Sequence, residues 1–355
     1  MDRTIEYSPL FSPVSADDIT TYRAELAARG SHQRVTAASI IGTVVVSLVA
    51  LFVVAVIVLP AILTATVALI DGNPAGAILP ALVPLGVVAG IAVLVVNAVR
   101  QHSAMWPARV RMHRFAQANG LLYEPKSAAP TYPGLIFGVG DSRAVTDHFR
   151  TTESRYLDFG NLTYSTGSGR SRTTHRWGFM ALHLDRALPH MVLDSRRNNG
   201  MLGGTNLPSL FSRDQTLSLE GDFDQHFTLH CPREYERDAL YVFTPDLMAL
   251  LIDEAAPFDV EIVDRWMFVY AAKPFPLADA TTYQRLLRIV STVGAKTLTQ
   301  TDRYVDERVG AFEPNLVAPG GQRLRKRFSW GSVALAVLLA IVIPGMAILT
   351  GLALR

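Results

Sequence analysis

The residues best suited to chemistry in this chain are two aspartates and two histidines on one short polar stretch. Asp222, Asp224, His226 and His230 flank or occupy the segment 225–231, in which polar and apolar residues alternate. Residues two apart in a strand share a face, so Asp222, Asp224 and His226 would lie together. Carboxylates and imidazoles are suitable ligands for zinc or manganese. A metal site is one interpretation, and the solvated polar face of a half-buried strand is the other.

Two further pairs have the residue types of acid–base catalysis. His183 lies beside Asp185, and His190 is followed by Asp194. A histidine and a carboxylate can exchange protons with a substrate at neutral pH. No sequence motif indicates a nucleophile near either pair. We therefore favour a structural interpretation, in which these residues occupy strand ends and turns. The sequence predicts no catalytic residue.

A glycine-rich segment, Gly167 to Ser171, superficially resembles a phosphate-binding loop. It lacks the lysine, the spacing and the following helix of such a loop, so we interpret it as a hairpin tip. The arginines around it could contact anionic lipid headgroups: Arg170, Arg172 and Arg176. Cys231 is the only cysteine, which excludes an intrachain disulfide, and its place on the apolar side of a strand predicts a buried, unreactive thiol.

These residues must be positioned by an α+β domain with a largely antiparallel sheet. Strand patterns are found at 121–123, 156–164, 176–184, 225–231, 258–263 and 265–270. The last two strands are predicted to form a hairpin around Asp264. Helices are predicted at 108–119, from Pro245 to Glu254, and after Asp279. Strands and helices neither alternate strictly nor separate fully, which is typical of α+β folds.

Three apolar segments are long enough to cross a bilayer. They cover 35–59, 75–99 and 332–354. Pro60 is expected to kink or end the first span, and Asp71 to Pro74 has the composition of a turn. The predicted organisation is a tail with a short helix (1–34), a two-span hairpin (35–99), a cytoplasmic α+β domain (100–310), a linker with a basic juxtamembrane segment (311–330) and a third transmembrane helix (331–355).

Positive charges beside the spans predict their orientation. Arg23, Arg29 and Arg34 precede the first span, and the connection between the first two spans has no Lys or Arg. A basic cluster precedes the third span: Arg323, Arg325, Lys326 and Arg327. Because cytoplasmic loops carry the positive charge, we expect a multi-pass protein of the bacterial plasma membrane with a cytoplasmic N-terminus and large domain. The same basic cluster is a candidate for contact with lipid headgroups.

Charge also excludes some partners and activities. Residues 101–327 carry 27 Lys and Arg against 25 Asp and Glu, so the domain lacks the basic excess of a nucleic-acid-binding protein. The predicted spans contain no charged residue, and intramembrane charges are what mark ion or proton pathways. The sequence therefore argues against a transporter or pump.

Three stretches carry a resemblance to a known family. They are Arg114 to Tyr123 (RFAQANGLLY), Phe227 to Asp246 (FTLHCPREYERDALYVFTPD), and the helix and strands ending at Tyr270. Together, over about residues 35–275, they resemble bacterial, actinobacterial-type integral-membrane proteins of unknown function. That resemblance implies two N-terminal spans before a cytoplasmic α+β domain, and it implies no activity or catalytic residue. The third predicted span is not part of the pattern.

Two functions are compatible with these observations. The leading hypothesis is a membrane-tethered, non-enzymatic interaction module that binds a protein partner, a second copy or the bilayer, with no cofactor. The alternative is a membrane-anchored enzyme, possibly metal-dependent, whose site includes the polar stretch from Asp222 to His230.

Overall fold

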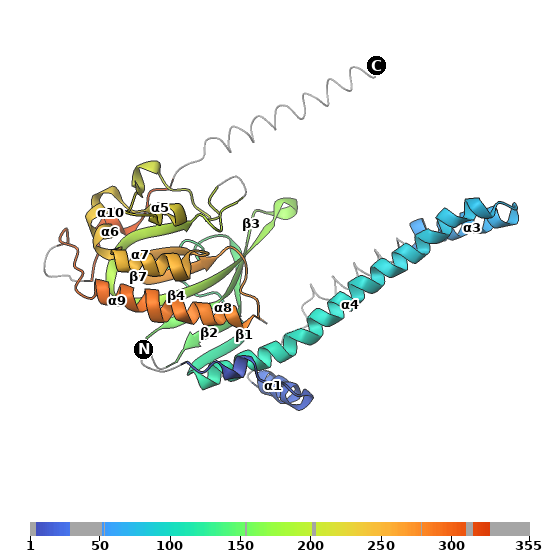
Figure 1. The fold of residues 1–355 in the computed structure, drawn as a ribbon, viewed down its shortest axis with the longest axis horizontal. Coiled ribbons are helices and arrows are strands. Elements are labelled where there is room, and N and C mark those ends of the chain that lie inside the picture. Colours follow the sequence, from blue (N-terminus) through green and yellow to red (C-terminus); the bar gives the residue numbers. More distant parts are fainter. Residues whose placement is uncertain are drawn as a thin grey trace, which may run out of the picture. The chain divides into compact units, whose positions relative to one another are not determined.

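The computed structural model describes residues 5–28, 52, 54–152, 155–200, 204–277, 279–309 and 315–326. The chain divides into two compact units. One comprises Pro9–Arg114, and the other comprises Met1–Ser8 with Phe115–Arg355. The first unit is helical, and the second contains the α+β domain (Figure 1).

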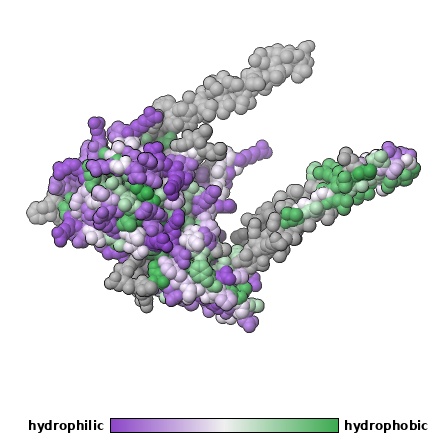
Figure 2. Space-filling model, viewed as in Figure 1, coloured by the Kyte–Doolittle hydropathy of each residue, from purple (hydrophilic) through white to green (hydrophobic). Residues whose placement is uncertain are grey.

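The helical unit contains α1 (Ala16–Ala28), a π-helical turn (Val54–Val58), α3 (Leu59–Ile70) and most of α4 (Pro74–Ala118). A capping box begins α1: the Ser15 backbone N–H donates to Asp18 Oδ2 (2.8 Å), and the Asp18 N–H donates to Ser15 Oγ (3.1 Å). The predicted turn separates α3 from α4, with Gly72 at φ 73°. Large apolar side chains of both helices are exposed, and Figure 2 shows hydrophobic residues gathered on α3.

Among the described residues, one helical segment is long and apolar enough to cross a membrane, Pro74–Ile91 of α4. A shorter apolar helical segment covers Ala55–Ile70. Most of the first predicted span (35–51) and all of the third (332–354) lie outside the described residues. Residues 108–118 are helical as predicted, but they are not a separate helix, because α4 continues without a break from Pro74 to Ala118. No glycine occurs between Asn97 and Trp106 to end the helix, and α4 tolerates Pro107 in its interior.

The α+β domain is built on a seven-stranded sheet, which confirms the predicted fold class for this part of the chain. Its strands are β1 (Leu121–Ala128), β2 (Asp141–Thr151), β3 (Leu157–Thr166), β4 (Thr173–Ser195), β5 (Thr216–Leu217), β6 (Phe227–His230) and β7 (Asp259–Ala271). The order is β1-β2-β3-β4-β6-β5, and β7 also pairs with β4. Every pairing between these strands is antiparallel.

The longest strand, β4, organises the sheet and corrects one prediction. The hairpin predicted around Asp264 does not form, because β7 is a single strand paired with β4 from Gly178↔Ala271 to Leu193↔Val260. Asp264 has φ 54° and pairs with Leu188, where the register shifts on both sides. The turn-like residue therefore forms an irregularity inside a long ladder. A partner strand of 23 residues makes that extended pairing possible.

Helices cover one face of the sheet. They include α6 (Glu236–Val242), α7 (Pro245–Leu250) with a π-helical turn to Ala255, α8 (Ala280–Ile289), a second π-helical turn (Val290–Gly294) and α9 (Ala295–Thr301). Figure 1 shows α8 and α9 running across the sheet. Tyr283 of α8 packs its ring 5.6 Å from that of Phe149 and 6.4 Å from that of Phe159. Burial of this apolar helix stripe against the strands stabilises the domain.

The opposite face is closed by two irregular segments. The loop 129–140 places Phe137 against Phe179 and Phe268, with ring centroids 5.1 and 5.5 Å apart. The other segment is residues 315–326, the C-terminal strap, which contains the short helix α10 (Pro319–Gln322). Val317 and Leu324 of the strap are buried, and the Ser212 N–H donates to the Arg325 carbonyl (3.1 Å).

Candidate functional site

The four predicted metal ligands are not brought together as one strand face. Gly221 turns the chain at φ 74°, and Phe223–His226 forms a four-residue helix, α5, so the strand begins only at Phe227. His226 Nε2 lies 3.8 Å from Asp222 Oδ2. Asp224 instead accepts hydrogen bonds from the Ser218 hydroxyl and the Leu219 N–H, and the His230 ring packs 5.1 Å from that of Phe211. In the part of the chain that is described, no three His, Cys, Asp or Glu residues gather as metal ligands.

Neither candidate acid–base pair is joined by a hydrogen bond in the structure. Asp185 makes a bidentate ion pair with Arg155, at 2.8 and 2.9 Å. His190 pairs with Glu261, which the sequence analysis did not single out, and not with Asp194. Both pairs were chosen by closeness in sequence, whereas side-chain contacts in a sheet form between strands.

The predicted headgroup arginines and the cysteine have identifiable surroundings. Arg172 contacts Asp141 and the Ser142 hydroxyl beside the β3–β4 hairpin tip, and Arg170 and Arg176 are exposed. Cys231 is buried as predicted, and burial raises the pKa of its thiol to about 12.

The basic cluster begins within the described residues. Arg325 forms an ion pair with Asp214, and Lys326 forms an isolated β-bridge with Phe211. Arg327 lies outside the described residues. Contact of Arg323, Arg325, Lys326 and Arg327 with lipid stays a prediction.

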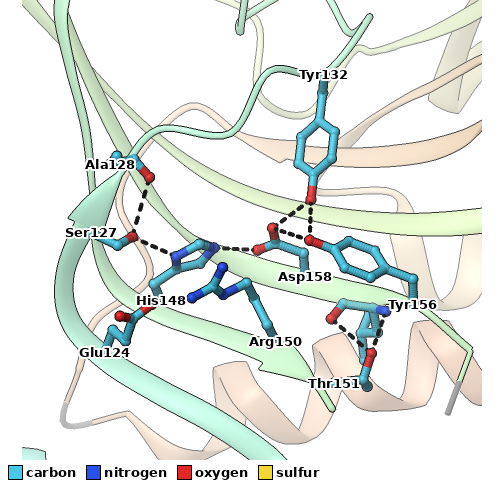
Figure 3. A network of polar contacts seen from close by, with 10 residues as sticks. Glu124, Ser127, Ala128, Tyr132, His148, Arg150, Thr151, Tyr156 and Asp158 are labelled. Carbon is cyan, nitrogen blue, oxygen red and sulfur yellow. Dashed lines mark hydrogen bonds and ion pairs between the residues drawn. The ribbon is translucent and has the colours of Figure 1, made fainter. Parts of the chain in front are cut away.

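A buried network joins three neighbouring strands on the face closed by the loop 129–140 (Figure 3). Ser127 of β1 places its Oγ 2.6 Å from Nδ1 of His148 on β2. The other ring nitrogen, Nε2, lies 2.6 Å from Oδ1 of Asp158 on β3. Asp158 Oδ2 accepts hydrogen bonds from the hydroxyls of Tyr132 (2.5 Å) and Tyr156 (3.4 Å). His148 is 2% exposed and Asp158 is fully buried, so this carboxylate depends on its protein partners.

The partners of His148 determine where its protons lie. A carboxylate can only accept, so the imidazole Nε2–H donates to Asp158. Nδ1 faces Ser127 Oγ, and the Ser127 hydroxyl also donates to the Ala128 carbonyl oxygen (3.3 Å). This serine–histidine–aspartate order is the order that activates a hydroxyl in hydrolases, with the two ring nitrogens exchanged relative to the chymotrypsin arrangement. Ser127 is the half-buried member of the three.

Aromatic side chains lie above this network and form what we call the aromatic shelf: Tyr132, Tyr156, His183 and Trp266. The Trp266 ring is central, with ring-centroid distances of 4.7 Å to Tyr132, 5.6 Å to Tyr156 and 5.0 Å to His183. Tyr156 is 37% exposed, and the other three are half-buried. The two tyrosine hydroxyl oxygens also lie 2.9 Å apart. The shelf therefore leaves Tyr156 accessible to solvent and places its two phenol groups beside Asp158.

Charged groups border the shelf. The Arg155 guanidinium bonds to the His183 carbonyl (3.2 Å) in addition to its bidentate pair with Asp185. Hydrogen bonds from Arg155 lower the pKa of the Asp185 carboxyl. Burial, reinforced by the charges of Arg265 and Arg155, lowers the pKa of His183. At neutral pH the shelf therefore contains an uncharged imidazole beside guanidinium groups.

A second buried histidine–carboxylate pair fixes the segments that close this face. Glu261 accepts hydrogen bonds from His190 Nε2 (2.8 Å), the Tyr270 hydroxyl (2.6 Å) and the Leu135 N–H (2.8 Å). The Leu324 N–H of the strap donates to His190 Nδ1 at 3.0 Å. One buried carboxylate thus fastens the loop 129–140 directly and the strap through a histidine. Figure 1 shows that these segments are far apart along the chain.

Sequence reasoning missed every member of the first network, because its residues come from separate strands. The sequence feature that could have indicated these residues is a charged residue between apolar residues inside a predicted strand. Asp158, between Leu157 and Phe159, is an example. Glu261 interrupts the apolar run 258–263 in the same way. Charged residues are almost never fully buried unless they are paired, so an acid at an inward-facing position points to a partner elsewhere.

This chain matches no protein-family model and no curated protein. A comparison with solved structures finds the crystal structure of the mycobacterial trehalose monomycolate transport factor A, with 12% sequence identity and a TM-score of 0.36. The alignment covers 53% of this chain and 93% of that chain. At that TM-score the likeness supports no argument about the fold or function of this chain.

Proposed function

We propose that this protein is a membrane-tethered interaction module whose aromatic shelf binds a protein partner. The observation that carries the proposal is the composition of the shelf, with Tyr156 exposed and Tyr132, Trp266 and Arg155 beside it. Tyrosine, tryptophan and arginine are the residues enriched at the energetic centres of protein interfaces. Large rings also provide contact area with few rotatable bonds.

The network beneath the shelf supports this function by holding the rings before a partner arrives. The Tyr132 and Tyr156 hydroxyls are bonded to buried Asp158, which is itself bonded to His148. Side chains that are already ordered lose little entropy on binding, so affinity is gained without additional contacts.

The membrane tether is proposed from the helical unit. The apolar helix of α4 and the exposed apolar side chains of α3 would be stabilised in hydrocarbon. Flanking charges orient the N-terminus and the α+β domain towards the cytoplasm. A reporter that works only outside the cytoplasm is expected to be active when it is fused after residue 72. A reporter that works only in the cytoplasm is expected to be active when it is fused after residue 309. The reverse pattern would contradict this topology.

Site-specific photo-crosslinking tests the shelf in the full-length protein in its host membrane. A photoreactive phenylalanine derivative at Tyr156 is expected to give a discrete crosslinked product that disappears with Trp266→Ala. Tyr241, which is 42% exposed on α6 outside the shelf, is the matched control position. Co-expression of two copies with different tags shows whether the crosslinked product is a dimer of this chain, because such a product carries both tags. Equal crosslinking at both positions, or none at Tyr156, would contradict a shelf-mediated interaction.

A second candidate function rests on the hydrogen-bond order of Ser127, His148 and Asp158. In a membrane-anchored hydrolase, Ser127 Oγ would attack an ester carbonyl carbon while its proton passes to His148 Nδ1. The ester C–O bond would then break, the alcohol would leave with that proton from His148, and water would hydrolyse the acyl-serine. A fluorophosphonate probe applied to the detergent-solubilised protein would then label Ser127, and labelling would be lost in Ser127→Ala and in His148→Ala. Absence of labelling in the folded wild-type protein would exclude this candidate.

A further inference from the structure

A polar cluster lies at the end of the sheet where β4 finishes and β7 begins. Asp259 is fully buried at the start of β7 and accepts from the Ser195 N–H (2.8 Å) and from Asn198 Nδ2 (3.0 Å). Asp194, 7% exposed near the end of β4, lies close enough that its charge raises the pKa of Asp259. Burial is the larger cause, and the pKa of Asp259 reaches about 7. Burial also raises the pKa of Asp194.

Unsatisfied oxygen atoms are concentrated in this cluster. Among the described residues, five buried side-chain nitrogen or oxygen atoms without a hydrogen-bond partner belong to this one segment. They are Asp194 Oδ1, Asn198 Oδ1, Asn199 Oδ1 and both polar side-chain atoms of Asn206. Buried polar groups in native proteins are nearly always paired with protein, water or an ion. Four acceptor oxygens of this segment therefore lack a hydrogen-bond partner, although the side chains of Thr205 and Asn199 hydrogen-bond to Asp194.

Neighbouring side chains do not supply the missing positive charge. Arg196 and Arg197 follow Asp194 in the chain but are exposed. The charge of Arg196 is the weakest of the influences on the Asp194 pKa. A hydrogen bond from the Gly200 N–H to the Gly204 carbonyl (3.0 Å) brings Asn198 and Asn199 back towards Asn206. The backbone thus holds these side chains in one neighbourhood, where the two acids are contacted by neutral amide and hydroxyl groups.

We propose that Asp194 and Asp259, together with Asn198, Asn199 and Asn206, bind a divalent cation of the calcium type. Every side chain in the set is a carboxylate or an amide, which offer hard oxygen ligands, and none is a histidine or cysteine of the kind that zinc favours. Calcium accepts six to eight oxygen ligands in irregular geometry, which suits donors from a loop and two strands. Magnesium requires a near-ideal octahedron and keeps several waters, so it fits this set less well.

Binding would neutralise the two carboxylates and satisfy the orphaned oxygens together. It would also connect the end of β4 to the start of β7, so calcium should stabilise the α+β domain. The full-length protein in mild detergent, stripped with a chelator, is titrated with calcium chloride by calorimetry, and its thermal unfolding is followed with and without the ion.

The wild-type protein is expected to bind one calcium ion and to unfold at a higher temperature when the ion is present. Asp194→Asn and Asp259→Asn should each weaken binding at least about tenfold, because ligand charge sets calcium affinity. Asp222→Asn, an exposed acid elsewhere, is the matched control and should bind normally. Unfolding temperatures in chelator show whether each variant is folded, and Asn199→Ala is an additional variant that leaves both carboxylates intact.

Two results would overturn the proposal. One is the absence of binding to the folded wild-type protein at about 10 mM calcium, above the roughly millimolar range of the weakest protein calcium sites. Waters and protons would then satisfy the cluster. The other is unchanged affinity in all three cluster variants, which would place the ion elsewhere. Tighter binding of magnesium than of calcium would refute the calcium assignment while keeping these residues as the cation site.

Discussion

Replacing Asp158 by asparagine removes the negative charge from the centre of the network beneath the aromatic shelf. The carboxylate is fully buried and accepts two short bonds, from His148 Nε2 (2.6 Å) and the Tyr132 hydroxyl (2.5 Å). Hydrogen bonds to a charged group contribute about 1.5–3 kcal/mol each. Asparagine keeps one acceptor oxygen and avoids burying a charge, which offsets part of the loss. We expect a net loss of about 2–4 kcal/mol in the free energy of unfolding, within the range for broken buried networks.

Thermal unfolding of the full-length protein in detergent, followed by tryptophan fluorescence, measures this loss. For a domain of this size, each kcal/mol shifts the midpoint by about 2–4 °C, so a decrease of about 4–16 °C is expected. Tyr156→Phe is the control, because its contact with Asp158 is long (3.4 Å) and its contact with the Tyr132 hydroxyl (2.9 Å) is exposed, where water can replace it. It should cost less than about 1 kcal/mol.

A double-mutant cycle with Tyr132→Phe distinguishes the network from a general packing effect. If the Tyr132 hydroxyl stabilises the fold through Asp158, the combined loss will be smaller than the sum of the two single losses. Additive losses, or an Asp158→Asn protein as stable as the control, would refute the argument that Asp158 anchors the shelf.

Three other outcomes follow from single positions. Gly140 has φ 67°, and a Cβ there would lie 2.3 Å from the Ser165 carbonyl oxygen, so Gly140→Ala should destabilise the domain by about 1–3 kcal/mol in chemical denaturation. Gly138→Ala, with open space around it, should not, and equal losses would contradict the steric argument. Burial lowers the pKa of His230 to about 4. As the pH falls below about 6.5, His230 is therefore protonated in the unfolded chain before it is protonated in the folded protein. Stability should therefore decrease from about pH 6.5 to pH 4, and His230→Gln should weaken that decrease in urea titrations, whereas an unchanged pH profile would show that His230 is not responsible. The high pKa and burial of Cys231 predict that iodoacetamide alkylates the native protein far more slowly than the urea-unfolded protein at pH 8, and comparable rates would contradict a closed core at this residue.

Features determined by local chemistry could be predicted from the sequence. The short helix of the N-terminal tail and the turn from Asp71 to Pro74 form as predicted, and the strand predicted at 225–231 forms over Phe227–His230. Each depends on residues within a few positions of one another, through a cap, a positive φ or an alternation of apolar side chains. The antiparallel α+β class also follows from the spacing of strands and turns.

Predictions failed where distant pairing overrides a local preference. Asp264 has the chemistry of a turn, yet the long partner strand β4 keeps it within a single strand. Asp222 to His226 alternates like a strand, but Gly221 and the short helix α5 separate it from the strand that follows. Local patterns set only a weak preference, and the pairing energy of a neighbouring strand decides the outcome.

The candidate sites were decided by tertiary structure alone. The aromatic shelf and its network combine residues from the loop 129–140 and from β1, β2, β3, β4 and β7. The polar cluster joins Asp194 to Asp259, 65 positions apart in the printed sequence. A sequence records that a residue is an acid or a histidine, but its chemistry depends on burial and on the partners that face it. Those are set when strands pair across long separations, which no local pattern encodes.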